Sequence, residues 1–167
     1  MDAEKLKALQ APLKERYKKN PASALVTLRA TAHVSEGISC SIETGKALAK
    51  AGLHPASGGD GTFACSGDML LEALAACAGV TLRAVATSIG ADVGDATVTA
   101  EGDLDFRGTL GVSKDVPVGF KVIRLKLNLE GKGSPEEMQT LKRLTERYCV
   151  VLQTLRQPPD ITVEIAR

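Results

Sequence analysis

Strict alternation of apolar and polar residues marks several segments of the chain and predicts strands with one buried face. In residues 24–33 (ALVTLRATAH), valine, leucine and alanine fall on one face, whereas the threonines, Arg29 and His33 fall on the other. A turn at Glu36-Gly37 leads into a second alternating segment, so we expect these two strands to pair as a hairpin. The strands predicted in this way cover residues 24–33, 38–42, 96–106, 120–131 and 161–167.

Two segments have the spacing of amphipathic helices, in which apolar residues recur every three to four positions. The first runs from Lys5 to Lys18, and Asn20-Pro21 ends it. The second begins at Ser134-Pro135-Glu136-Glu137, because a serine cap, a proline in the first turn and a glutamate at the third position satisfy free amides at a helix start. Its apolar stripe, which includes Thr145, continues until Pro158-Pro159.

The segment from Asp68 to Ile89 is almost continuously apolar and rich in alanine. A surface helix has an apolar stripe on one side, so this pattern predicts a helix buried on most of its sides. Ser66-Gly67-Asp68 is its expected N-terminal cap. A helix of about 22 residues is about 33 Å long, which a small chain with one-sided strands has difficulty covering. We therefore expect a homodimer in which two such helices bury each other.

Residues 45–65 are rich in glycine and follow neither period, which predicts an ordered loop. GGDG at 58–61 and TGKA at 44–47 lack the spacing of nucleotide-binding loops and are interpreted as turns. The strands come in adjacent groups, which favours an α+β fold with largely antiparallel sheets. We expect one domain, residues 1–167, in which residues 1–20 form a helical extension.

Composition limits the classes of function. The chain has 167 residues, of which 44% are hydrophobic, and a formal net charge of +1. These values exclude a disordered chain or a strongly basic nucleic-acid clamp. The start of the chain mixes charges with leucines, unlike a signal peptide, and no uncharged apolar run reaches about 18 residues. We expect a cytoplasmic, soluble protein that binds neither nucleic acid nor a membrane.

The four cysteines, at positions 40, 65, 77 and 149, form no C-x-x-C pair and no metal-type cluster with His33 and His54. We therefore expect no metal and no cofactor. Cys40, on the apolar face of the second predicted strand, is interpreted as a packing residue. In a reducing compartment a disulfide would be transient and catalytic rather than structural.

Cys77 lies in the middle of the apolar helix, where two interpretations are open. A buried free cysteine commonly packs as a small hydrophobe, whereas a reactive thiolate requires a nearby cation or hydrogen-bond donors. Arg29 and Arg83 are the candidate cations, and Glu72 would pair with such an arginine because an unpaired charge inside an apolar run is costly. Cys149 is either another packing residue or the second thiol that condenses with an oxidised Cys77.

Two segments resemble a known family. SGDMLLEALAACAGVTLRAVA (66–86) and SPEEMQTLKRLTERYCVV (134–151) are similar to the OsmC/Ohr family, the osmotically induced protein C and organic hydroperoxide resistance proteins. The resemblance runs through roughly residues 24–167. It implies an intertwined α+β homodimer with buried central helices, and a thiol-dependent peroxidase site at the subunit interface.

The resemblance also implies a role for each site residue. Cys77 attacks an organic hydroperoxide and becomes a sulfenic acid, and Cys149 resolves it as a disulfide that an external dithiol reduces. Arg29 stabilises the thiolate and the departing alkoxide, while Asp68 or Glu72 holds the arginine. The aliphatic surroundings of Cys77 favour organic hydroperoxides over hydrogen peroxide.

The chain departs from the family pattern at two places. Ser66-Gly67-Asp68 stands where typical members have N-P-E, and Val150 follows the second cysteine where proline is common. These departures indicate a divergent branch. An alternative hypothesis is therefore a non-catalytic protein of the same fold that binds a small apolar ligand or acts in a stress response, with the cysteines as packing residues.

Overall fold

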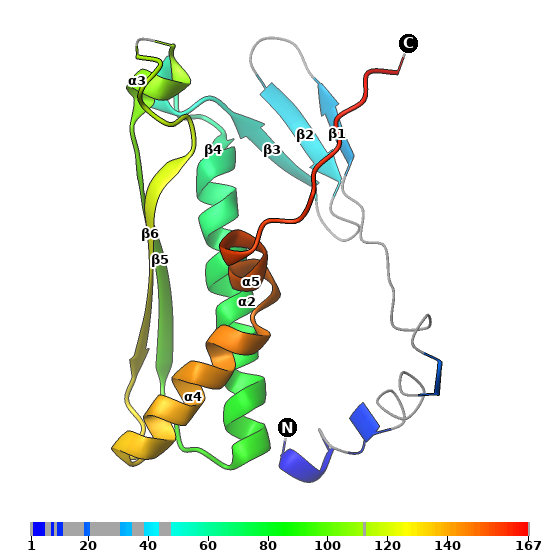
Figure 1. Cartoon of the computed structure of the whole chain (residues 1–167), viewed down its shortest axis with the longest axis vertical. Helices are drawn as coiled ribbons and strands as arrows, with labels where there is room; N and C mark the ends of the chain where they lie inside the picture. Colours follow the sequence, from blue (N-terminus) through cyan, green and yellow to red (C-terminus); the bar gives the residue numbers. More distant parts are fainter. Residues whose placement is uncertain are drawn as a thin grey trace. The chain divides into compact units, whose positions relative to one another are not determined.

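The computed structural model describes residues 2–5, 8, 10, 11, 19, 20, 31–34, 39–43, 48–111 and 113–166, and for residues 31–49 the backbone alone. The described residues of the predicted N-terminal helix are helical at positions 5, 8, 10 and 11, and the rest of that prediction lies outside the described residues. The elements are β1 (Thr31–Val34), β2 (Ser39–Glu43), β3 (Leu48–Gly52), the 3-10 helix η2 (Pro55–Ser57), β4 (Ala64–Cys65), α2 (Ser66–Ile89), β5 (Ala96–Leu104), α3 (Phe106–Thr109), β6 (Phe120–Leu129), α4 (Pro135–Tyr148) and α5 (Val150–Arg156) (Figure 1).

The chain divides into two compact units. The first comprises Met1–Leu6, Ala73–Thr99 and Lys126–Arg167, and the second comprises Lys7–Glu72 and Ala100–Leu125. The helix α2 and the strands β5 and β6 continue from one unit into the other. The mixture of helices with mainly antiparallel strands confirms the predicted α+β class.

The second unit contains a four-stranded sheet in the order β1-β2-β3-β4. The predicted hairpin is confirmed, because β1 and β2 pair antiparallel with Thr31 opposite Glu43. The prediction that residues 45–65 form an ordered loop without regular elements is wrong at its two ends, since β3 pairs antiparallel with β2 and parallel with β4. These strands have five and two residues, too few to show a period among alanines and glycines, and the neighbouring strand sets their register. The side chain of Cys40 lies outside the described residues.

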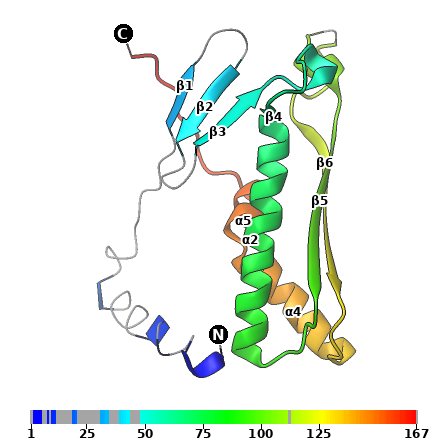
Figure 2. The same ribbon diagram turned by 180° about the vertical axis from the view of Figure 1, so that it is seen from behind.

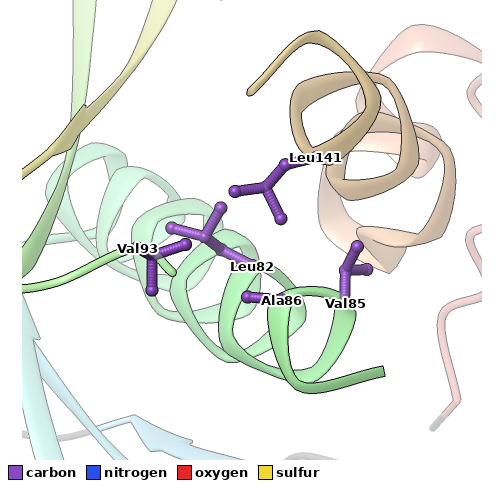
Figure 3. Close-up of a cluster of buried hydrophobic side chains, with 5 residues drawn as sticks. All are labelled: Leu82, Val85, Ala86, Val93 and Leu141. Atoms are coloured by element: carbon purple, nitrogen blue, oxygen red, sulfur yellow. The ribbon is translucent and has the colours of Figure 1, made fainter. Parts of the chain in front are cut away.

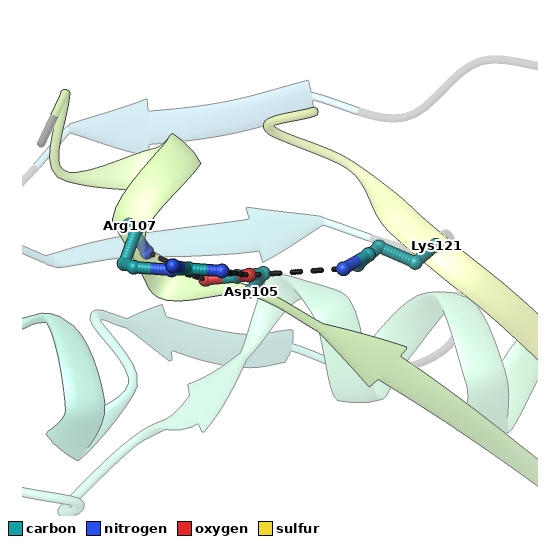
Figure 4. A network of polar contacts seen from close by, with 3 residues as sticks. All are labelled: Asp105, Arg107 and Lys121. Atoms are coloured by element: carbon teal, nitrogen blue, oxygen red, sulfur yellow. Dashed lines mark hydrogen bonds and ion pairs between the residues drawn. The ribbon is translucent and has the colours of Figure 1, made fainter. Parts of the chain in front are cut away.

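A network of charged side chains holds the turn between β5 and α3, also in the second unit (Figure 4). Asp105 caps α3 by accepting the Arg107 amide at 3.1 Å, and it pairs with the Arg107 guanidinium at 2.6 Å. Lys121 lies 3.8 Å from the same carboxylate. The hydrogen bonds from the Arg107 side chain are the main reason that the pKa of Asp105 falls to about 2.

The strands β5 and β6 pair with each other and run in opposite directions (Figure 1). Along β6 the side chains of Ile123, Leu125, Leu127 and Leu129 are partly buried and alternate with exposed ones, as the sequence predicts. Gly102 is required on β5, because a Cβ there would stand 2.6 Å from ring atoms of Phe120. The aromatic ring therefore covers the glycine backbone across the strand pair.

The core of the first unit lies between α2 and α4 (Figure 3). Leu82 and Leu141 are 2% and 0% exposed, and partly buried side chains from β5 and β6 pack against them. The buried members of this cluster are Leu82, Val85, Ala86, Val93 and Leu141, and the partly buried ones are Ala91, Val98, Leu127, Leu129, Met138 and Leu144. Seen from the opposite side, α4 again lies beside α2 (Figure 2).

The start of α4 confirms the predicted cap. Ser134 accepts the Glu137 amide at 3.2 Å, and the Glu137 carboxylate accepts the Ser134 amide at 2.7 Å. The prediction of one continuous helix up to Pro158-Pro159 is wrong. Cys149 has a non-helical backbone (φ −72°, ψ 105°), so α4 ends before it and α5 begins after it.

Two apolar segments stay uncovered in the single chain, and for α2 the predicted burial depends on the expected homodimer. The helix α2 buries one side, with Leu74 and Ala78 at 0% exposure, but Val80 is 74% exposed. The predicted strand at 161–167 is absent from residues 161–166, where Ile161 is 79% and Ile165 is 89% exposed. A strand needs partners for its backbone groups, and no described strand of this chain pairs with the segment.

By length and composition α2 also qualifies as a membrane span, a test that core helices of soluble proteins pass as well.

Candidate active site

Cys77 and Cys149 come together in the first unit, although they are far apart in the sequence. Cys77 lies on α2, and Cys149 is the single residue between α4 and α5. The two side chains lie close enough that each thiol changes the pKa of the other. Cys77 is partly exposed and Cys149 is 0% exposed. Cys77 is therefore the residue of the pair that reaches solvent, and Cys149 is enclosed by the protein.

The surroundings of Cys77 favour its thiolate. Burial of the sulfur acts to raise the pKa of Cys77, but hydrogen-bond donors outweigh burial, and the pKa lies below its ordinary value. These donors are the amides of Val151 and Val150, the thiol of Cys149 and the hydroxyl of Thr81. All of them are neutral groups, so the described part of this site activates the thiol through directed dipoles.

The break at Cys149 makes two of these donors available. The first amides of a helix have no partner within it, and Val150 and Val151 are the first residues of α5. The side chain of Cys149 does not cap α5. Both amides instead act on Cys77, because each of them lowers the pKa of its thiol. The sequence did not predict the non-helical backbone of Cys149. This break starts α5 at Val150 and so leaves its first two amides free to act on Cys77.

The pKa of Cys149 moves in the opposite direction. Burial raises the pKa of Cys149, and the neighbouring Cys77 raises it further, although the amides of Leu152 and Val151 oppose both effects. Cys149 is therefore the member of the pair that keeps its proton, and its S–H group faces the sulfur of Cys77 and favours the Cys77 thiolate. The pair contains one nucleophile and one neutral thiol.

The other predicted site residues do not join this pair in the described structure. Arg29 lies outside the described residues. Asp68 is in the first turn of α2 and is exposed, as is Glu72. Five residues of an α-helix turn about 140° beyond one full circle, so Glu72 and Cys77 face different sides of α2. Arg83 is also exposed, and its guanidinium donates to the carbonyl of Gly94 at 3.3 Å.

The start of α2 differs from the predicted cap. Ser66 is already helical, and the sulfur of Cys65 accepts the Gly67 amide at 3.4 Å. Cys65 is a free, partly buried thiol. Among the residues that the structure describes, no three His, Cys, Asp or Glu side chains gather in a way that could hold a metal ion.

Sequence reasoning missed the hydroxyl of Thr81 and the two backbone amides that act on Cys77. Thr81 lies one turn after Cys77 on α2, a spacing that the sequence already contained. The amides of Val150 and Val151 left no signal, because any residue except proline has one.

Comparison with known proteins identifies the fold. An OsmC-like protein from Mycoplasma pneumoniae is 17% identical, with a TM-score of 0.68 over 80% of this chain and 89% of that chain. The organic hydroperoxide resistance protein OsmC from Legionella pneumophila is 23% identical, with a TM-score of 0.58 over 80% and 91%. The organic hydroperoxide resistance protein OhrB of Bacillus subtilis is 19% identical, with a TM-score of 0.57 over 80% and 93%. At such identities the likeness establishes the fold.

The sequence comparison identifies the family of the chain. No curated protein sequence matches the chain. The family described as OsmC-like protein matches residues 59–164, a range that contains both thiols of the pair and every element from the start of α2 to the end of α5. This chain belongs to the OsmC-like family.

Proposed function

We propose that this protein is a thiol-dependent peroxidase that reduces organic hydroperoxides with Cys77 as the attacking thiol and Cys149 as the resolving thiol. The observation that carries the proposal is the meeting of two free thiols with opposite pKa shifts, lowered at the partly exposed Cys77 and raised at the buried Cys149. Membership of the OsmC-like family supports it, as do neighbours in fold that are named organic hydroperoxide resistance proteins.

In the first step the Cys77 thiolate attacks one oxygen of the peroxide. A sulfur–oxygen bond forms, the oxygen–oxygen bond breaks, and the alkoxide leaves and takes up a proton. The thiolate is the reactive form of cysteine, so the donors around Cys77 increase the fraction that reacts at neutral pH. Arg29 would add a positive charge for the alkoxide, and Asp68 or Glu72 would hold that arginine from a second subunit.

In the second step Cys149 attacks the sulfenic acid of Cys77. The sulfur–oxygen bond breaks, a disulfide forms, and the thiol proton of Cys149 leaves with the hydroxide as water. An external dithiol then reduces the disulfide by thiol exchange and becomes a disulfide itself. The cycle uses neither a metal nor a cofactor.

The homodimer is part of the proposal. The uncovered side of α2, where Val80 is 74% exposed, and the alternating segment from Ile161 to Ile165 are apolar surfaces that a second copy would cover. Light scattering should give about twice the chain mass of 17.5 kDa, and a monomer at micromolar concentration would contradict the dimer. We place the protein in the cytoplasm, where its thiols stay reduced.

The rival hypothesis of an apolar-ligand carrier has less support. A surface cavity of about 230 Å³ is lined by Gln139, Lys142, Arg143 and Glu146 on α4, which are polar or charged. Apolar ligands are bound in sites lined mainly by hydrophobic and aromatic side chains. The reactive environment of Cys77 also has no use in a protein whose cysteines only pack.

The reduced protein treated with one equivalent of cumene hydroperoxide tests the proposal. Mass spectrometry should show the loss of two thiols and a Cys77–Cys149 link. Cys149→Ser should stop at a sulfenic acid on Cys77, and Cys77→Ser should consume no peroxide. Cys65→Ser is the matched control and should behave like the wild type. An unreacted Cys77, or first oxidation at Cys40 or Cys65, would contradict the assignment.

A further inference from the structure

Thr145 is an unexplained polar residue in the core of the first unit. Thr145 is 1% exposed. Among the residues that the structure describes, its hydroxyl is the one buried polar side-chain group that has no hydrogen-bond partner. A helical threonine commonly donates to the carbonyl four residues earlier, here Leu141, but this bond is not made. A buried polar group without a partner destabilises the fold, so its presence points to a use in another state of the protein.

Thr145 lies close to Cys149 along α4, which points to a use at this thiol. It lies one helical turn before Cys149, and the Cys149 amide donates to the Thr145 carbonyl at 3.0 Å. Side chains four residues apart share one face of a helix, with Cβ atoms about 5–6 Å apart. The φ of Cys149, −72°, is still helical, so its Cα–Cβ bond leans toward the helix N-terminus as in a helix, which brings its side chain to the side of Thr145. Leu141, Thr145 and Cys149 are all almost fully buried on this face.

We propose that Thr145 is a positioning residue of the resolving step, and that its hydroxyl donates a hydrogen bond to the Cys149 sulfur when this thiol becomes a thiolate. The inference rests on the proposed peroxidase function and assigns a part of it to a residue outside the cysteine pair. Thr145 acts through Cys149 and does not contact the peroxide.

The chemistry of the two states explains why the hydroxyl is free in the reduced protein. There, Cys149 is a neutral thiol, and its S–H group favours the thiolate of Cys77. When Cys77 has become a sulfenic acid, Cys149 must release its proton to attack, and the proton leaves with the displaced hydroxide as water. A buried thiolate then needs donors, and the amides of Leu152 and Val151 reach its sulfur from α5. Thr145 adds a donor from the α4 side.

Thr145→Val removes the hydroxyl and keeps the shape of the side chain, so it isolates this contribution. Reduced wild type and variant are mixed rapidly with one equivalent of cumene hydroperoxide. Sulfenic acid is trapped with dimedone, and the Cys77–Cys149 disulfide is quantified by mass spectrometry over time. We expect disulfide formation to slow about tenfold in Thr145→Val, while sulfenic acid forms at the wild-type rate and accumulates. Thr145→Ser should restore the rate to within about threefold.

Two controls separate this role from a structural one. Thr87→Val makes the same change on α2, where the hydroxyl donates to the Arg83 carbonyl at 2.8 Å, and should leave both steps unchanged. Thr145→Val should also melt at the wild-type temperature or above, because it removes a buried hydroxyl without a partner. A slower second step in a protein that is no less stable cannot arise from damage to the fold.

The outcomes distinguish this inference from the function on which it rests. A wild type that forms neither sulfenic acid nor disulfide overturns both. A wild type that forms both, with Thr145→Val closing the disulfide at the same rate, overturns the role of Thr145 alone. Equal slowing of both steps, or a Thr145→Ser variant as slow as Thr145→Val, also overturns it.

Discussion

The two ends of α4 are held in different ways. At its N-terminus, Ser134 and Glu137 satisfy each other's backbone amides, and Pro135 supplies a preset backbone angle. At its C-terminus, Cys149 leaves the helical conformation, and its free thiol lies beside the thiol of Cys77 on α2. The first end is fixed by four consecutive residues, whereas the second is fixed together with another helix.

This difference shows which end of α4 contributes to the candidate site. A local cap stabilises a helix wherever that helix packs, so it carries no information about a partner. The break at Cys149 opens the amides of Val150 and Val151, which a continuous helix would have paired, and both donate to Cys77. The end that is less regular is therefore the end that builds the site.

The largest effect is expected where α4 packs against α2. Leu141 is 0% exposed and lies in the cluster with Leu82 and Val85. Leu141→Ala should lower the free energy of unfolding by about 3 kcal/mol, since large-to-small changes in a core cost about 2–5 kcal/mol. Urea unfolding measures it. Leu110→Ala, at a side chain 55% exposed, is the control and should cost less than about 1 kcal/mol, and equal losses in the two variants would contradict the packing.

A smaller effect is expected at the C-terminal end. Val150→Pro removes one amide donor to Cys77, and a hydrogen bond to a charged group contributes about 1.5–3 kcal/mol. The fold should tolerate the change, because proline suits the first position of a helix and Cys149 already has the extended backbone that precedes proline. The pKa of Cys77 should rise toward its ordinary value, and its reaction with iodoacetamide at pH 7 should slow about tenfold.

The pH dependence of the same reaction gives the control. A lowered pKa means that the wild-type thiolate persists as the pH falls below the range of an ordinary thiol, about 8.5. The rates of wild type and Val150→Pro should therefore converge above pH 9 and separate as the pH falls. Val150→Ala keeps the amide and should follow the wild type. Parallel profiles for all three proteins would show that the Val150 amide does not act on Cys77.

Most of the first unit and half of the site could be predicted from the sequence. The period of β6, the cap of α4 and the apolar run of α2 are local signals, and the two cysteines stand out within them. The small strands β3 and β4 could not be predicted, because their register depends on β2. No strand forms at residues 161–166, and one side of α2 stays uncovered, because the described residues supply no surface that would cover either of them.

The activating groups were the harder part of the site. The sequence directed attention to charged side chains, above all Arg29, Asp68 and Glu72, because charges are visible in a sequence. The donors that the structure places on Cys77 are backbone amides and the hydroxyl of Thr81. Amides are present at almost every residue, so their role depends on the break at Cys149, which no local pattern marks.

The smallest effect is expected at the N-terminal end of α4. Ser134→Ala removes the side-chain acceptor of the Glu137 amide, and the loss of such a cap costs about 1 kcal/mol. Ser134→Asp keeps an acceptor and should retain the wild-type stability. Because this end is held by its own residues, both variants should keep the iodoacetamide reactivity of Cys77 within about twofold. A cap variant that lowered stability and Cys77 reactivity together would mean that the two ends of α4 are coupled, and the local cap would then belong to the site as well.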